Sequence, residues 1–223
     1  MEFSAKLAAM EGMIPPQVLL GAYARGVFPM AEDGEIQWYE PRMRGLIPLD
    51  ERFHVPRRLA RRMRSEPFEI SWDRDFEAVM RGCAEREETW IDEVIVASYL
   101  ELQRLGCAHS VECWDGGELV GGLYGVALGR VFFGESMFSR RTDASKVALV
   151  ELVGRLRAGG YRVFDTQWLT PHLRQFGGVE VGREEYLKLL AETLEAGPAE
   201  RPLGGGAIHQ EEVEGRSGSS SGL

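Results

Sequence analysis

Apolar and polar positions alternate along this chain in two rhythms, one typical of helices and one typical of strands. Apolar residues three and four positions apart predict helices over about 16–25, 56–65, 75–86, 92–105, 144–158 and 184–194, and a short helical segment that begins at Pro171. Gly26, Gly106 and Gly159 follow three of these segments, where glycine is the residue that most often ends a helix.

Short apolar runs bounded by turn residues predict strands over 68–71, 108–114, 118–128, 131–138 and 161–166. Asp115, Gly116 and Gly117 join the second run to the third, and this triplet is a strong hairpin signal. Gly129 and Arg130 then turn the chain into the run 131–138. We therefore expect an antiparallel meander of three strands, followed by a long helix and one more strand.

The distribution of residue types divides the chain into three parts. Residues 13–50 are rich in Pro, Gly and aromatic residues, so beyond the first helix we expect an irregular lobe. We predict a small N-terminal lobe at 1–45 and a main domain at 46–196, of the α+β class with a mixed sheet flanked by helices. The tail, 197–223, is rich in Gly, Glu and Ser and is predicted to be disordered.

The composition excludes some classes of function. With 223 residues and 44% hydrophobic content, the chain can form one sizeable core, and its net charge of −9 argues against general affinity for nucleic acid. The longest uncharged run, 119–129, is too short to cross a bilayer. The first residues carry no basic segment followed by an apolar one, so we expect neither a signal peptide nor a membrane protein.

The three cysteines, Cys83, Cys107 and Cys113, match no zinc-binding spacing. They are expected to be free thiols in the reducing cytoplasm. A metal site made from Cys107, Cys113 and His109 would lack a fourth ligand, so no metal is predicted.

One basic segment stands out from the acidic average. Five arginines lie within eight residues, and on a helix they share neighbouring faces; they are Arg57, Arg58, Arg61, Arg62 and Arg64. A solvated basic face is one interpretation. The other is a surface that contacts phosphates, because the guanidinium group pairs with phosphate through two hydrogen bonds. Such an isolated cluster favours local docking of an RNA.

A carboxylate lies in the middle of the predicted buried strand 131–138. Burying Glu135 is costly unless a cation or several hydrogen-bond donors meet it. Glu135 is therefore either paired within the protein or exposed at an edge, or it meets a cationic group of a substrate. Gly134, directly before it, indicates a β-bulge or a close approach of another backbone.

The predicted order of elements, a meander that passes through a helix into a further strand, resembles the fold of the GCN5-related N-acetyltransferases. Members of that superfamily carry a glycine-containing loop after the third of these strands, and its amides hold the pyrophosphate of coenzyme A. Here residues 139–146 contain no glycine, and Asp143 places a carboxylate at that point. The acyl donor is therefore not expected to be coenzyme A.

Several motifs resemble those of the leucyl/phenylalanyl-tRNA–protein transferase family, in the expected order and over roughly residues 13–194. They are Tyr23-Ala-Arg-Gly-Val-Phe-Pro-Met30, Trp38, Arg44-Gly45, Thr89-Trp-Ile91, Ala108-His-Ser-Val-Glu112, Trp114, Leu119 to Val126, Phe133-Gly-Glu-Ser-Met-Phe-Ser139, Ala144-Ser-Lys146, Asp165, Gln167 and His172-Leu173. The family commonly has Ile-Asp-Cys-Gln where this chain has Phe164-Asp-Thr-Gln167, which alters the expected pocket but keeps the Asp and the Gln. The usual Leu-Gly-Ala is Phe176-Gly-Gly178, a change in packing.

The resemblance implies transfer of Leu or Phe, with Met as a further candidate, from aminoacyl-tRNA to a protein or peptide with an N-terminal Arg or Lys, which marks the acceptor for degradation. No cofactor is implied, since the tRNA ester is already activated, and we expect a cytoplasmic monomer. A coenzyme A-dependent N-acetyltransferase and a non-catalytic RNA-binding module are the alternatives. The glycine-free loop argues against the first, and the intact Asp165, Gln167 and Glu135 argue against the second.

The resemblance also assigns roles to residues. Asp165 and Gln167 form the catalytic pair; on one strand they would share a face, and Asp165 would hold the Gln167 amide. Because an amide is a very weak base, Gln167 is expected to position the attacking amine. Glu135 is expected to contact either this amine or the cationic side chain of the acceptor residue. The aminoacyl pocket is expected to comprise Leu123, Phe132, Met137, Leu152 and Phe164, with Met30 and Trp90 near the terminal adenosine. His109 and His172 are expected to be structural, and Lys146 to meet either a phosphate or a carboxylate.

Overall fold

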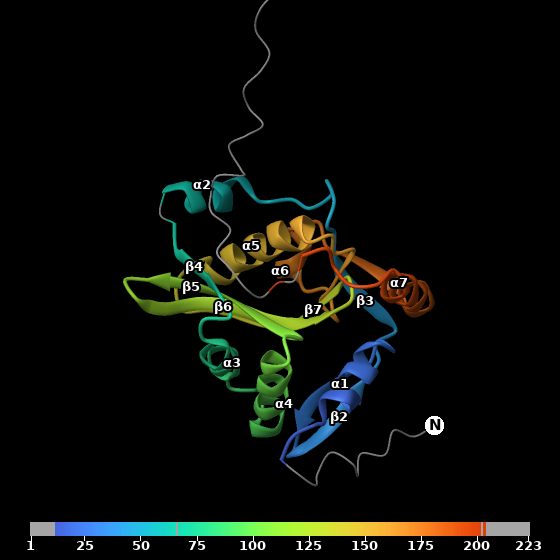
Figure 1. The fold of residues 1–223 in the computed structure, drawn as a ribbon. Helices are drawn as coiled ribbons and strands as arrows, with labels where there is room; N and C mark the ends of the chain where they lie inside the picture. The colour runs from blue at the N-terminus through green and yellow to red at the C-terminus, as the bar shows by residue number, and fades with distance from the viewer. Residues whose placement is uncertain (1–11, 66, 202, 204–223) are drawn as a thin grey trace, which may run out of the picture.

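The computed structural model describes residues 12–65, 67–201 and 203, and a seven-stranded mixed sheet forms its centre (Figure 1). The strands lie in the order β4-β5-β6-β7-β8-β3-β9. Their bounds are β3 (Met43–Ile47), β4 (Glu69–Trp72), β5 (Ala108–Asp115), β6 (Glu118–Leu128), β7 (Val131–Ser139), β8 (Val163–Asp165) and β9 (Val179–Gly182). Among these described strands only β7 and β8 pair in parallel; the other neighbours are antiparallel.

Helices cover both faces of this sheet, as the sequence predicts for a mixed α+β domain (Figure 1). On one face lie α2 (Arg57–Ser65), α5 (Ala144–Ala158) and α6 (Pro171–Arg174); on the other lie α3 (Phe76–Ala84) and α4 (Glu93–Arg104). The helix α7 (Arg183–Glu195) packs beside β3, β7 and β9. Each face therefore has its own apolar core, one under α5 and the other under α3 and α4.

The predicted meander and crossover are present. The strands β5, β6 and β7 follow one another through tight turns, and α5 then leads to β8, which lies parallel to β7. Three of the described helices begin with a side-chain cap: the Asp75 carboxylate accepts from the amide of Ala78, the Asp92 carboxylate from the amide of Ile95, and the Thr170 hydroxyl from the amide of Leu173. Each cap lies directly before the first turn of its helix, where the apolar spacing of the sequence places the start of the helix.

The N-terminal region is more regular than predicted. After α1 (Pro16–Tyr23), the strands β1 (Phe28–Glu32) and β2 (Glu35–Tyr39) form a hairpin. The next strand, β3, lies inside the main sheet between β8 and β9, so a boundary at residue 45 falls within a strand of that sheet. The irregular lobe expected over 13–50 is thus a helix, a hairpin and one central strand.

The C-terminal tail begins with ordered contacts. The backbone amide of Glu200 donates to the Gly159 carbonyl at 2.9 Å, and the Arg130 side chain donates to the Pro198 carbonyl at 3.1 Å. Residues 198–201 therefore pack against the domain, contrary to the disorder expected from 197. The rest of the predicted disordered segment, from 204 on, and residue 202 lie outside the described residues.

Candidate functional site

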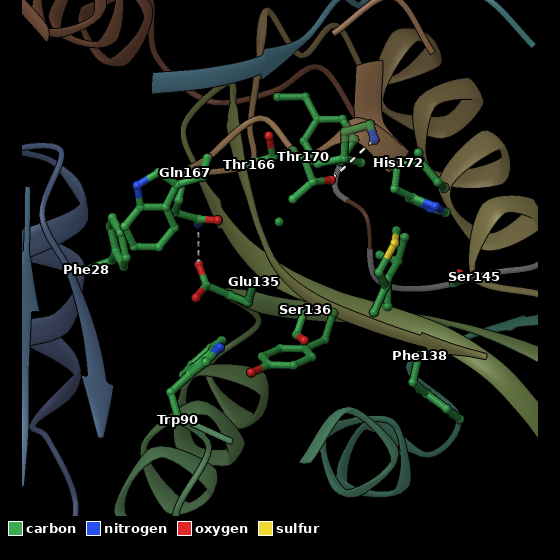
Figure 2. Close-up of a pocket in the computed structure, with 18 of the residues that line it drawn as sticks. Phe28, Trp90, Glu135, Ser136, Phe138, Ser145, Thr166, Gln167, Thr170 and His172 are labelled. Carbon is green, nitrogen blue, oxygen red and sulfur yellow. Dashed lines mark hydrogen bonds between the residues drawn. The ribbon is translucent and has the colours of Figure 1, made fainter. Parts of the chain in front are cut away.

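A cleft of about 580 Å³ opens between the end of β7, the segment after β8, and the β1–β2 hairpin (Figure 2). Apolar side chains form most of its wall, and a few polar groups point into it. Among the residues that line it are Phe28, Met30, Trp90, Leu123, Glu135, Met137, Leu149, Phe164, Gln167, Trp168 and His172.

A β-bulge places Glu135 at this cleft. In the pairing of β6 with β7, Tyr124 lies opposite Ser136 while the next residue, Gly125, lies opposite Gly134, so Glu135 is the extra residue of the bulge. A Cβ atom on Gly134 would lie 2.8 Å from the Phe164 ring, and one on Gly125 would collide with the backbone oxygen of Phe133. Both glycines are needed for the strands to approach this closely, which the sequence indicated for Gly134.

Glu135 is held by neutral donors. The Tyr99 hydroxyl donates to Oε2 at 3.2 Å, and the Gln167 side-chain amide donates to Oε1 at 3.0 Å (Figure 2). Tyr23 is hydrogen-bonded to Tyr99 behind them. Burial raises the pKa of Glu135 to about 7, with a contribution from the charge of Asp165, although the hydrogen bonds of both tyrosines and the charge of Arg44 oppose the shift. Glu135 is half-buried and lines the cleft, so its carboxylate is hydrogen-bonded within the protein and is also open to a group bound in the cleft. Contact with a cationic group of a substrate stays a prediction.

Asp165, at the end of β8, is fully buried and does not line the cleft. The Arg44 guanidinium pairs with it, at 2.9 Å from Nε to Oδ1 and 2.8 Å from Nη2 to Oδ2. The Tyr186 hydroxyl donates to Oδ2, and the backbone amide of Gln167 donates to Oδ1 at 2.8 Å. Asp165 is therefore surrounded by hydrogen-bond donors from three separate segments of the chain.

The contact between Asp165 and Gln167 therefore differs from the one expected from the sequence. The strand ends at Asp165, and Gln167 has a φ of 57°, a left-handed conformation that turns its side chain away from the alternation of a strand. Asp165 holds the Gln167 backbone, while the Gln167 side chain reaches Glu135. Gly45 supports this turn: a Cβ atom there would lie 2.6 Å from the backbone nitrogen of Leu169.

The predicted aminoacyl pocket is only partly the pocket of the structure. Leu123, Met137 and Phe164 line the cleft, and so do Met30 and Trp90. Phe132 and Leu152 are fully buried and lie outside the lining, because they face the core beneath it; Phe132 packs edge-on against Phe164 at 5.6 Å between ring centroids. From α5, Ser145 and Leu149 line the cleft, and Leu149 lies three residues before Leu152.

Sequence patterns missed the groups that hold the site from behind. Arg44 is 1% exposed, so it breaks the apolar pattern of β3, and Tyr23, Tyr99 and Tyr186 look like ordinary core residues. The guanidinium group of Arg44 also lies 4.9 Å from the centre of the Phe28 ring, at the cleft wall. In the sequence, the available signal for this role was Arg44 beside Gly45, directly before the apolar residues Leu46 and Ile47.

The structure shows the neighbours of His109, Lys146 and His172. The His109 Nδ1 atom lies 2.8 Å from a carboxylate oxygen of Asp73, remote from the cleft lining, and Lys146 pairs with Asp143 at 2.6 Å. His172 lines the cleft, and burial lowers its pKa, with a contribution from the charge of Lys146. A carboxylate, rather than a phosphate, is thus the partner of Lys146 in this structure.

The arginine cluster lies on α2 as predicted. Leu59 faces the core at 3% exposure, while Arg57, Arg61 and Arg64 are exposed. Arg58 lies 3.9 Å from Asp143, and Arg62 stacks on the Phe68 ring at 4.7 Å. The cluster is separate from the cleft but on the same side of the sheet as α5 (Figure 1).

Within the described ranges, no group of three metal-binding side chains comes together, and no helix there has the length and apolarity to cross a membrane. The three cysteines are free thiols. The groups of the cleft that can take part in a reaction are thus the carboxyl group of Glu135, with a pKa of about 7, and the oriented amide of Gln167, next to an apolar wall.

Comparison with known proteins assigns the chain to a family. The family model described as leucyl/phenylalanyl-tRNA protein transferase matches residues 46–191, and the model of the N-terminal domain of the same proteins matches residues 12–42. The chain belongs to the leucyl/phenylalanyl-tRNA–protein transferase family. It contains both parts of the family pattern, and the N-terminal match ends directly before β3.

Curated members of this family are similar over most of their length. A transferase of this name from Cereibacter sphaeroides is 56% identical over 86% of this chain and 90% of its own. The one from Paramagnetospirillum magneticum is 59% identical over 79% and 88%, and the one from Herpetosiphon aurantiacus is 54% identical over 83% and 97%. A solved structure, L-PGS from Bacillus licheniformis, aligns with a TM-score of 0.38 at 14% identity, over 67% of this chain and 48% of its own.

Several of the motifs that resemble the transferase family in sequence meet at the cleft. Met30, Trp90, Glu135, Gln167 and His172 come from separate segments of the chain, yet all of them line it. Other residues of the motifs, such as His109 and Trp114, lie outside the lining.

Proposed function

We propose that this chain transfers a leucyl or phenylalanyl group from aminoacyl-tRNA to the α-amine of an N-terminal Arg or Lys on an acceptor protein or peptide. The observation that carries the proposal is the Gln167–Glu135 hydrogen bond at the mouth of an apolar pocket. It combines an oriented amide and a titratable carboxyl with space for an apolar side chain. Family membership supports the same reaction.

The reaction is aminolysis of an ester. The α-amine nitrogen attacks the ester carbonyl carbon, a C–N bond forms, and the C–O bond to the tRNA ribose breaks. The attacking ammonium must lose a proton, and the leaving ribose oxygen must gain one. We assign the transfer of this proton to Glu135, because a carboxyl group with a pKa of about 7 exchanges protons readily near neutral pH.

Gln167 acts by position. Its amide nitrogen is bound to Glu135, so the carbonyl oxygen of the same amide is directed elsewhere and is available to accept a hydrogen bond from the incoming amine. Asp165 acts indirectly, since it holds the backbone of Gln167 in its left-handed conformation. A fixed polar group at the reacting centre lowers the barrier because it does not need to reorganise.

The donor occupies the rest of the cleft. We assign the aminoacyl side chain to the apolar part made by Leu123, Met137, Leu149 and Phe164, where the flexible thioether of Met137 adapts to either Leu or Phe. We assign the terminal adenosine to Trp90 and Met30, because an aromatic face stacks on a base. The arginines of α2 are assigned to the phosphates of the tRNA body.

Other expectations belong to the same proposal. The transfer needs no cofactor, because the ester is already activated, and the acceptor would be marked for degradation. We expect the protein to act as a monomer in the cytoplasm, where aminoacyl-tRNA is present. We also propose that the main sheet follows the acyltransferase fold of the GCN5-related superfamily; the meander β5–β6–β7 and the crossover through α5 to a parallel β8 support this.

The test uses leucyl-tRNA labelled on the leucine and a peptide that begins with Arg. We expect label to move to the peptide, and the same peptide with an acetylated N-terminus to receive none. Acetyl-CoA in place of the tRNA should give no acetylated peptide, because residues 139–146 offer no glycine loop for its pyrophosphate. Acetyl transfer without leucyl transfer would overturn the proposal.

A further inference from the structure

Trp168 follows Gln167 directly and has no role in the chemistry above. Its side chain is 45% exposed, although it lines the cleft that contains the reacting groups. Three other large apolar side chains reach similar exposure within the described segments, and they are Met43, Leu105 and Val179. None of those three lines the cleft, so Trp168 alone among these four presents an open ring beside the site.

Two other rings hold Trp168 in place. Its ring packs edge-on against Phe28 at 5.2 Å between centroids, and it meets Tyr39 at 6.1 Å with an angle of 71°. Phe28 and Tyr39 stack on each other at 6.0 Å. Phe28 is 2% exposed and anchors the group to the core, so the exposed Trp168 ring has a rigid support.

The surroundings of this ring are negatively charged. Between Phe28 and Pro41 the hairpin carries four carboxylates and no lysine or arginine. Arg183 pairs with Glu40, which leaves the charges of Glu32, Asp33 and Glu35. The Tyr39 hydroxyl donates to Glu32, which brings one carboxylate to the edge of the ring group. A buried cation nearby, Arg44, lies against Phe28 and is neutralised by Asp165.

We propose that Trp168 receives the basic side chain of the acceptor's N-terminal residue, with the cation over the indole ring and Glu32 at its far end. This inference rests on the proposed function, which brings the α-amine of that residue to Gln167. A cation over an aromatic ring is attracted by the ring quadrupole, most strongly for tryptophan. A guanidinium also stacks its plane on an aromatic face. The site thereby distinguishes Arg and Lys from neutral residues of similar length.

The position of Trp168 supports this occupant over the terminal adenosine. Trp168 and Gln167 are adjacent in sequence, so a residue whose amine contacts Gln167 has its side chain next to the indole. The adenosine has its own aromatic partner in Trp90, which comes from a different segment. Negative charge from the hairpin suits a cation and disfavours the phosphates that accompany a base.

The experiment compares acceptor peptides that begin with Arg, Lys or citrulline, which has the shape of Arg without its charge. Trp168→Ala should lower kcat/KM for the Arg and Lys peptides about three- to thirtyfold, the range of a partly desolvated cation–π contact. The preference for Arg over citrulline should fall by a similar factor, while kcat/KM for leucyl-tRNA should stay the same. Trp168→Phe should keep most of the preference, and Glu32→Gln should lose part of it.

Leu105→Ala is the matched control, because Leu105 is 47% exposed but lies at the end of α4 outside the cleft, and it should change neither substrate's kinetics. An unchanged preference for Arg over citrulline in an active Trp168→Ala protein overturns the proposal. A raised KM for leucyl-tRNA in that variant also overturns it, in favour of a base stacked on Trp168. Both results leave leucyl transfer intact, whereas a wild-type protein that transfers no leucine removes the proposed function and this site together.

Discussion

Glu135 changes its charge near neutral pH, so its contribution to the rate can be recognised by its pH dependence. Burial raises its pKa to about 7, and a carboxyl that accepts a proton must be ionised. Transfer by the wild type should therefore rise as the pH increases through about 7 and be lost as the pH falls below it. Glu135→Gln should be slower and lack this inflection.

The measurement is the single-turnover rate of both proteins with one acceptor peptide, over a pH range from well below to well above the pKa of Glu135. The peptide's own α-amine titrates near ~7.7–8.0, but it contributes equally to both proteins and cancels in the ratio of their rates. A ratio that does not change with pH would show that Glu135 carries no proton.

Asp165 and Gln167 should differ in what their loss does to the protein. Gln167→Ala removes a positioned polar group at the reacting centre and should lower transfer by about two orders of magnitude with little change in stability. Asp165→Ala should be as slow but also destabilise the fold, by about 3–5 kcal/mol, because Arg44 stays buried without its partner. Thermal unfolding and transfer rates of both variants separate the two effects. Near-wild-type turnover of Gln167→Ala would exclude this residue from the mechanism.

Leu149 and Leu152 provide a matched pair for the donor pocket. Both lie on α5 and are at most 1% exposed, but only Leu149 lines the cleft. Alanine at either position should cost about 2–5 kcal/mol of stability. Only Leu149→Ala should also shift the ratio of leucyl to phenylalanyl transfer, measured with equal amounts of both charged tRNAs. An equal shift in both variants would contradict the boundary of the pocket.

At the scale of elements, the proposed contact of α2 with the tRNA phosphates is tested by the salt dependence of tRNA binding. Replacing two of the exposed arginines, Arg57 and Arg61, by Gln should weaken tRNA binding and reduce the slope of log Kd against log salt by about 0.9 for each lost phosphate contact. A puromycin-sized donor, which lacks the tRNA body, should react at the wild-type rate. The binding titration at several salt concentrations checks this, and an unchanged slope would remove α2 from the tRNA interface.

Helices and strands with a regular spacing of apolar residues were predictable from the sequence. The hairpin β5–β6, the turn into β7, and α5 occur within a residue or so of their predicted bounds, because turn triplets and apolar spacing act locally. The strands β1, β2, β3 and β9 were not predicted. They are short, and Pro29 and the buried Arg44 interrupt the alternation by which strands are recognised.

Part of the candidate site was predictable in its members, but its connections were not. Gly134 and Glu135 signalled the bulge, since a regular buried strand seldom contains a carboxylate directly after a glycine. Because of the left-handed turn at Gln167, its side chain contacts Glu135 and not Asp165. This turn depends on Gly45 and Arg44, which come from a strand far away in the sequence. Long-range packing of this kind has no local pattern.

At the scale of the whole molecule, the sheet brings together segments that the sequence separates. The N-terminal part supplies Phe28, Met30 and Arg44, the meander supplies Glu135, and the segment after β8 supplies Gln167. Because β3 lies between β8 and β9, the N-terminal region and the main domain share one sheet. The cleft therefore depends on the folding of both matched family regions.

One measurement tests the central claim most directly. The protein is mixed with total tRNA charged with all amino acids and with a peptide that begins with Arg, and the product is read by mass spectrometry. The apolar pocket and the Glu135–Gln167 pair predict a peptide extended at its N-terminus by one residue, Leu or Phe, and the same extension missing with Gln167→Ala. An unmodified peptide, or extension by all amino acids without preference, would contradict it.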